Sequence, residues 1–190
     1  MLRLVHLEEI EGLLRKAPVL VDLLEKKDVG IVKEVNCWLK SLERALNNNR
    51  MAIASNVASF RSVLVSADQG VIAAGISFHG KLTKRKIREA SCSYVLQNAN
   101  DIVANVIQRD INRFDEAESL MRQLIAVAKA KRAIQAKPEG LDHTQYLTSI
   151  WANLSSDPEM LAGTVRIEGF LGPHDSLVIL DRIMASDITS

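Results

Sequence analysis

The sequence predicts an all-α protein, a mostly helical bundle around a long central amphipathic helix or helix pair. Residues 81–137 contain no glycine and no proline, and apolar side chains recur through them at helical spacing. Hydrophobic residues make up 47% of the chain but aromatic residues only 4%. The core must therefore be built mainly from Leu, Ile, Val and Ala, a composition that is common in helical bundles.

Residues 81–137, which we call the spine, are the longest predicted element. A single helix from Thr83, a possible N-cap, to Ala136 would be about 80 Å long at a rise of 1.5 Å per residue. Because this length is unusual in a small protein, we expect a break within residues 112–116. Asn112 could cap a second helix there, with acidic residues in its first turn.

Shorter helices are predicted before the spine. The first covers residues 2–17, and Pro18 suits the first turn of the next one. Asp28 is placed to cap a third helix, which ends at residues 47–49. The apolar stripe of this third helix is Ile31, Val35, Trp38, Leu39, Leu42, Ala45 and Leu46.

A fourth helix is predicted over residues 51–67, with Gly70 just past its end. The valines and the glycine in this region leave a short β-hairpin within 62–80 as the alternative. Small residues cover the other faces of this helix, so a second helix could approach it closely.

The chain after the spine begins with a linker at residues 138–140, followed by a short helix over 142–154. Residues 155–159 resemble the start of another helix, because Pro158 suits a first helical position. Residues 163–172 alternate between apolar and polar side chains and are bracketed by glycines, so a strand within 163–180 is the alternative there. A final helix is predicted over 177–184.

Charge and the linker together predict two parts. The first is a helical bundle over 1–137 that includes the spine, which carries twelve Lys or Arg against six Asp or Glu. The second is a smaller acidic helical part over 138–190, packed on the first, with two basic and eight acidic residues. These opposite charges could attract each other within one molecule, between molecules, or toward different partners.

Several protein classes are disfavoured by what the sequence contains. The two cysteines, Cys37 and Cys92, lack metal-site spacing, and we expect both to be buried free thiols. No apolar run approaches the ~20 residues needed to span a bilayer. Acidic residues stand near the N-terminus where a secretory signal would be apolar. We therefore expect a cytoplasmic protein without a membrane partner.

A partial phosphate-binding motif lies at residues 75–83. Gly75, Gly80 and Lys81 fit the G-x-x-x-x-G-K-[ST] pattern, but Leu82 stands where the hydroxyl belongs and Thr83 comes one residue late. Residues 177–181 form an apolar run ending in Asp, as such proteins use near the metal. Because the spine leaves no room for alternating strands and helices, a nucleotide-binding enzyme is a remote alternative.

A basic cluster marks the start of the spine, and it consists of Lys81, Lys84, Arg85, Lys86 and Arg88. Cations at a helix N-terminus oppose the helix dipole, which indicates that they serve a ligand or partner. Nucleic-acid binding through this cluster is an alternative function. Aromatic residues for base stacking are scarce, however, and no known nucleic-acid-binding motif is present.

No catalytic residue set, metal-ligand set or cofactor motif emerges from the rest of the chain. The four histidines, His6, His79, His143 and His174, are scattered and form no helical pair. The preferred interpretation is a non-enzymatic interaction or regulatory protein that uses helical grooves and charged faces. Its expected partner is another protein or a second copy of itself.

Overall fold

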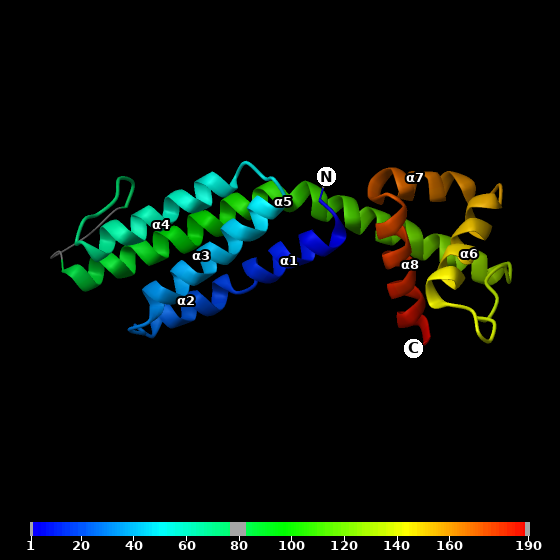
Figure 1. The fold of residues 1–190 in the computed structure, drawn as a ribbon, viewed down its shortest axis with the longest axis horizontal. Coiled ribbons are helices and arrows are strands. Elements are labelled where there is room, and N and C mark those ends of the chain that lie inside the picture. The colour runs from blue at the N-terminus through cyan, green and yellow to red at the C-terminus, as the bar shows by residue number, and fades with distance from the viewer. Residues whose placement is uncertain (1, 77–82, 189–190) are drawn as a thin grey trace. The chain divides into compact units, whose positions relative to one another are not determined.

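The computed structural model describes residues 2–76 and 83–188, and every regular element within them is an α-helix (Figure 1). The all-α prediction is therefore confirmed. The helices are α1 (Leu4–Leu14), α2 (Ala17–Glu25), α3 (Ile31–Asn48), α4 (Ala54–Asp68), α5 (Lys84–Ala130), α6 (His143–Ser156), α7 (Leu161–Leu171) and α8 (Pro173–Ile188).

Backbone contacts group the chain into two compact units. The N-terminal unit consists of Leu2 and residues 4–108, and the C-terminal unit is centred on residues 109–190. Helix α5 contributes residues to both units. Groups of residues defined by backbone contacts do not by themselves mark domain boundaries. The boundary expected after residue 137 therefore stays a prediction.

Helix α3 is the centre of packing for the helices that precede the spine. Its buried residues are the stripe predicted from the sequence, and the helix packs against α1, α2 and α4. The indole nitrogen of Trp38 donates a hydrogen bond of 2.8 Å to the carbonyl oxygen of Leu13, which ties α3 to α1. Burial of an apolar stripe of this width removes its side chains from water, which offsets the entropy lost when the helix is ordered.

The first predicted helix is shorter than expected, because the chain turns between Leu14 and Ala17. Helix α1 buries Leu4, Leu7 and Ile10, whereas Leu13 and Leu14 are only partly buried. Pro18 lies in the first turn of α2, as predicted, where its missing N–H costs no helical hydrogen bond.

Helix α4 ends in the glycine turn that the sequence predicts. Gly70 has a φ of +84°, and its N–H bonds the carbonyl of Ala67 while that of Val71 bonds the carbonyl of Ser66. This pattern satisfies the last carbonyls of the helix and needs a left-handed residue, which glycine supplies without strain. The hairpin alternative is wrong for residues 62–76, and residues 77–80 lie outside the described part.

Helix α5 runs unbroken for 47 residues, so the break expected at 112–116 is wrong. The buried stripe passes through this segment at Ile107, Phe114 and Ala117, so the apolar spacing never loses its helical period. Arg113 and Asp110 also form an ion pair of 3.1 Å along the helix. Asn112 is therefore an exposed interior residue of α5 rather than a cap.

In the C-terminal unit, α6 begins at His143, one residue after the predicted start, and its N-cap is Asp142. Its carboxylate oxygen Oδ2 accepts hydrogen bonds from the backbone N–H groups of Thr144, at 2.9 Å, and Gln145, at 3.3 Å. These backbone bonds lower the pKa of Asp142, because they favour its ionised form. Helix α6 packs against α7 and α8.

Helix α7 replaces the strand that was the alternative for residues 163–172, and α8 covers the rest of 163–180. The strand alternative is wrong because the buried residues of this region, Met160, Thr164, Ile167 and Leu171, have helical spacing. Gly163 lies against α5: a methyl group placed on it would be 2.9 Å from Leu124 Cδ2. The glycine permits close helix packing and does not mark the end of a strand.

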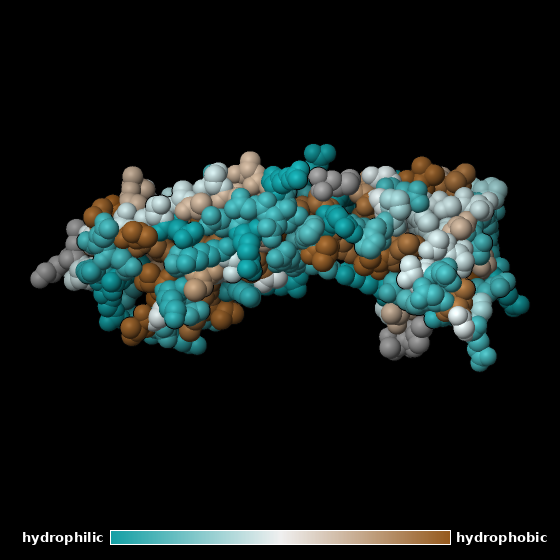
Figure 2. All heavy atoms as spheres, viewed as in Figure 1, coloured by the Kyte–Doolittle hydropathy of each residue, from teal (hydrophilic) through white to brown (hydrophobic). Residues whose placement is uncertain are grey.

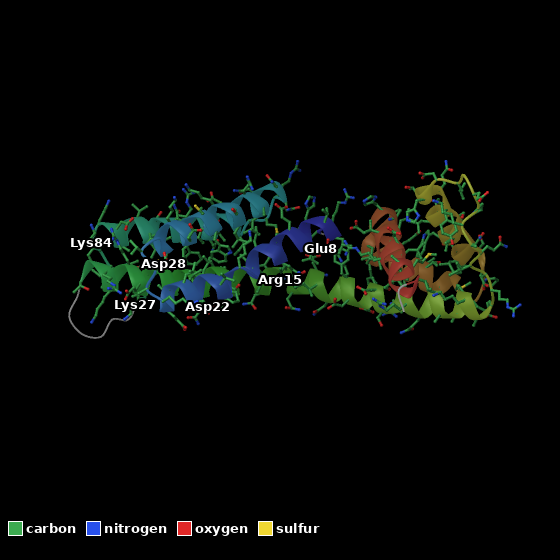
Figure 3. All side chains as sticks on the ribbon, turned by 90° about the horizontal axis from the view of Figure 1, so that it is seen from below. Glu8, Arg15, Asp22, Lys27, Asp28 and Lys84 are labelled. Atoms are coloured by element: carbon green, nitrogen blue, oxygen red, sulfur yellow. The ribbon has the colours of Figure 1, made fainter. Side chains whose placement is uncertain are left out.

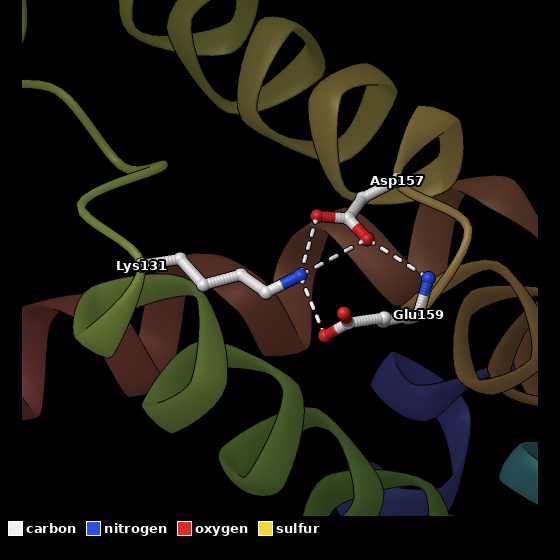
Figure 4. Close-up of polar contacts among 3 residues, drawn as sticks. All are labelled: Lys131, Asp157 and Glu159. Atoms are coloured by element: carbon white, nitrogen blue, oxygen red, sulfur yellow. Dashed lines mark hydrogen bonds and ion pairs between the residues drawn. The ribbon is translucent and has the colours of Figure 1, made fainter.

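An ion-pair cluster joins the end of α5 to the turn between α6 and α7 (Figure 4). The Lys131 ammonium nitrogen lies 3.0 Å from Asp157 Oδ2 and 2.7 Å from Glu159 Oε2. Hydrogen bonds to Glu159 and then Asp157 raise the pKa of Lys131, and its ammonium group lowers the pKa of Asp157. Asp157 also accepts a bond from the N–H of Glu159, which shapes the turn before α7.

Candidate partner-binding groove

A groove of about 670 Å³ opens on the N-terminal unit. It is lined by the loop between α2 and α3 and by one face each of α3, α4 and the first turns of α5. Figure 3 places the labelled Lys27, Asp28 and Lys84 at the same end of this unit. The groove is therefore formed by segments that lie far apart in the sequence.

The loop between α2 and α3 places an apolar side chain in the open. Lys27 adopts a φ of +58°, and Asp28 Oδ1 accepts a 2.6 Å hydrogen bond from the N–H of Gly30. Val29, between Asp28 and Gly30, has a relative exposure of 101%. The prediction that Asp28 caps α3 is wrong, because Gly30 occupies the cap position and no side chain caps the helix. Asp28 instead stabilises the turn before α3 through this hydrogen bond.

The floor of the groove is aliphatic. Ile31 and Leu64 are buried with the core, whereas Val32 is partly buried and Val65 is 59% exposed. On the face of the molecule drawn in Figure 2, apolar residues (brown) interrupt the hydrophilic surface (teal) at the end where α2 and the start of α5 lie. Exposed apolar side chains that gather in one groove are a feature of surfaces that bind a partner.

Each of the three arginines in the groove lining makes an ion pair. Arg88 Nε lies 2.7 Å from Asp68 Oδ1, Arg85 Nε lies 2.8 Å from Glu89 Oε1, and an Arg61 terminal nitrogen lies 2.9 Å from Glu43 Oε2. The remaining cations of the lining, Lys27 and Lys33, are exposed and make no ion pair within the described part of the chain.

The structure brings only some of the predicted basic cluster to this groove. Arg85 and Arg88 line it, whereas Lys84 and Lys86 are exposed on the first turn of α5 outside the lining. Thr83 caps this turn by accepting from the N–H of Lys86 at 3.3 Å. Lys81 lies outside the described residues, so its role stays a prediction.

The phosphate-binding pattern is mostly beyond what the structure describes, because Gly80 and Lys81 fall in residues 77–82. Gly75 is described and has a φ of +90°. Residues 71–76 form no strand before it, and residues 177–181 lie in helix α8. The two sequence features therefore lack the strand context that a P-loop protein requires.

Sequence reasoning missed most of the groove lining, including its exposed lysines and valines: Lys27, Val29, Lys33 and Val65. An available signal was Val29, because an apolar residue between two predicted helices has no helical stripe to join. Val65 carried a similar signal, because it lies outside the apolar stripe predicted for its helix: Ile53, Val57, Phe60, Leu64 and Ala67.

The C-terminal unit contains a smaller pocket of about 480 Å³ between the segment after α5, α6 and α8. At its edge, His143 Nε2 lies 2.7 Å from Asp181 Oδ1. No group of three or more His, Cys, Asp or Glu within the described residues could hold a metal ion. In that same part of the chain, none of the helices is long and apolar enough to cross a bilayer.

Comparison with known proteins shows no relationship: the chain matches no protein-family model, no curated protein and no solved structure.

Proposed function

We propose that this chain is a non-enzymatic interaction or regulatory protein that binds a segment of a partner protein in the groove of its N-terminal unit. The observation that carries the proposal is the pair of exposed valines, Val29 and Val65, in a groove whose lining also contains the buried Ile31 and Leu64. Burying such side chains against a partner removes apolar surface from water, which is the main favourable contribution to protein association.

The chemistry of the groove also supports binding rather than catalysis. Among the described residues, its lining contains no histidine, cysteine, serine or threonine that could act as a nucleophile or proton carrier near neutral pH. Its carboxylates are engaged, since Asp68 and Glu89 pair with arginines and Asp28 accepts a backbone N–H.

A peptide selection tests this function. A displayed library of random peptides would be selected against the full chain, and the recovered peptides measured against Val29→Ser/Val65→Ser. Serine keeps the surface uncharged, so the double variant removes only apolar contact. We expect this variant to lose at least about tenfold in affinity, the size of effect found when interface anchors are truncated.

The control is Val5→Ser/Val19→Ser, which removes two other exposed valines, at 58% and 60%, from the same unit outside the groove. We expect this control to bind as the wild type does. Recovered peptides that bind both double variants equally well, or a selection that recovers no binder, would contradict the proposal.

A further inference from the structure

We infer that the occupant of this groove is an amphipathic helical segment with an acidic face, supplied by a partner protein. The inference rests on the proposed function and adds the chemistry of the partner. Charge complementarity carries it, because positive charge remains unpaired along a lining whose acids are already engaged.

The acids of the lining already have hydrogen-bond or ion-pair partners, whereas two of its lysines have none within the described part of the chain. Asp68 and Glu89 each face an arginine, and Asp28 accepts the N–H of Gly30. Lys27 and Lys33 have no such partner among the described residues and stand on the loop and α3 beside the valines. An incoming carboxylate would therefore meet available ammonium groups in a lining whose five described cations outnumber its three described acids.

The arginines can also accept a second acid. The side chains of Arg85 and Arg88 remain 66% and 42% exposed while they hold their ion pairs. A guanidinium group has five N–H donors, so one carboxylate does not use them all. Acids on the partner could therefore add to the existing pairs of these arginines without displacing Glu89 or Asp68.

The pattern of the groove suits a helix. Along α4, the lining residues Arg61, Leu64, Val65 and Asp68 cover two helical turns, roughly 10 Å at 1.5 Å per residue. An amphipathic helix places apolar side chains at intervals of three and four residues, with its charges beside them. Such a helix could set its apolar side chains between Val29 and Val65 while its acids reach Lys27 and Lys33.

The test uses a fluorescein-labelled synthetic peptide of about five helical turns, with Leu on one face and Glu beside it. A second peptide carries Lys in place of every Glu, and a third carries Gln. Anisotropy would be measured with the full chain at about 50 and 300 mM NaCl, since salt screens interactions between exposed charges. We expect the Glu peptide to bind at least about tenfold more tightly than the Lys peptide at low salt, because like charges repel.

Charge reversal in the protein gives the second comparison. Lys27→Glu/Lys33→Glu should weaken binding of the Glu peptide by at least about tenfold and leave the Gln peptide within about twofold. The control Lys16→Glu/Lys40→Glu reverses two exposed lysines of the same unit outside the groove. This control should bind as the wild type does, which separates local pairing from net charge.

The outcomes distinguish the partner chemistry from the proposed function. Equal binding of the three peptides that is still lost in Val29→Ser/Val65→Ser would overturn the acidic partner and keep the groove. Failure of every peptide would count against both. A labelled oligonucleotide is the last comparison. If it binds more tightly than the Glu peptide, and if Lys84→Glu/Arg85→Glu/Lys86→Glu abolishes that binding, the acidic helix is overturned in favour of nucleic acid.

Discussion

Cys37 and Cys92 occupy different environments although both stand among helical apolar positions. Cys92 is fully buried on α5, and burial, with a smaller effect from the charge of Asp68, raises the pKa of its thiol to about 12. Cys37 is exposed on α3, so the prediction that both thiols are buried is wrong for this residue. It lies just off the buried stripe, between Val35 and Trp38.

Thiol labelling should therefore separate the two cysteines. At pH 8 a thiol with a pKa of about 12 is ionised in roughly one molecule in ten thousand, and a maleimide reagent also cannot reach it. We expect native protein to take up one label, Cys37→Ser to take up none, and denatured protein to take up two. Mass spectrometry would count the labels.

In this experiment Cys92→Ser is the control and should label like the wild type. Rapid labelling of native Cys37→Ser would contradict the burial of Cys92.

For the candidate site, some of the residues that line the groove could be predicted from the sequence, but the side chains with which they form ion pairs could not. The sequence indicates that Arg85 and Arg88 are part of a basic cluster, and both line the groove. It does not indicate that Arg88 meets Asp68, because that pair depends on how α4 packs beside α5. Lys27 and Val29 were missed for a related reason, since a loop acquires its neighbours only when the helices pack.

At the scale of elements, the success of each helix prediction followed the width of its apolar stripe. Helix α3 carries seven buried residues on one face, and all seven were predicted. The segment of α7 was ambiguous because its apolar and polar side chains alternate and glycines bracket it, a pattern that also suits a strand. Packing on α5 and α6 outweighs that local preference, and such contacts cannot be read from a short window of sequence.

Two glycines of α7 provide a matched test of this packing. Gly163 faces Leu124 so closely that a side chain would have to displace it, whereas nothing lies within 4 Å of a methyl group placed on Gly169. We expect Gly163→Val to lower the free energy of unfolding by about 1–3 kcal/mol through overpacking. Gly169→Ala should raise it by about 0.4–1 kcal/mol, because it restricts the unfolded chain.

Chemical denaturation of both variants would measure these effects. A Gly163→Val protein as stable as the wild type would show that α7 does not approach α5 as described. The double variant Gly163→Val/Leu124→Ala should recover part of the loss, since it removes the atoms that clash.

At the scale of the whole molecule, one helix supplies core residues to two compact units. Val95, Ala99 and Val103 of α5 are buried in the N-terminal unit, and Met121 and Ile125 are buried in the C-terminal unit. Each unit also contains one of the two tryptophans, Trp38 and Trp151. Single-tryptophan variants can therefore report on each unit separately.

Proline substitutions at exposed positions of α5 should act locally. Proline inside a helix costs about 3 kcal/mol or more, because it removes a hydrogen bond and clashes with the preceding turn. We expect Gln97→Pro to destabilise chiefly the unit reported by Trp38 fluorescence. Ser119→Pro should destabilise chiefly the unit reported by Trp151.

The alanine variants at positions 97 and 119 are the controls, and both should resemble the wild type. Equal shifts of both tryptophan transitions with either proline would show that the two cores unfold as one.

The shared helix also has a consequence for the order in which the chain folds as it is synthesised. The core of the N-terminal unit includes Val103 and Ile107, so helices α1 to α4 emerge from the ribosome before the helix that completes their core exists. The apolar surface that α5 covers in this unit stays exposed to water until more than half of the chain has been made. Once α5 docks, its second half extends a helix that is already nucleated, which lowers the cost of forming the surface on which α7 assembles.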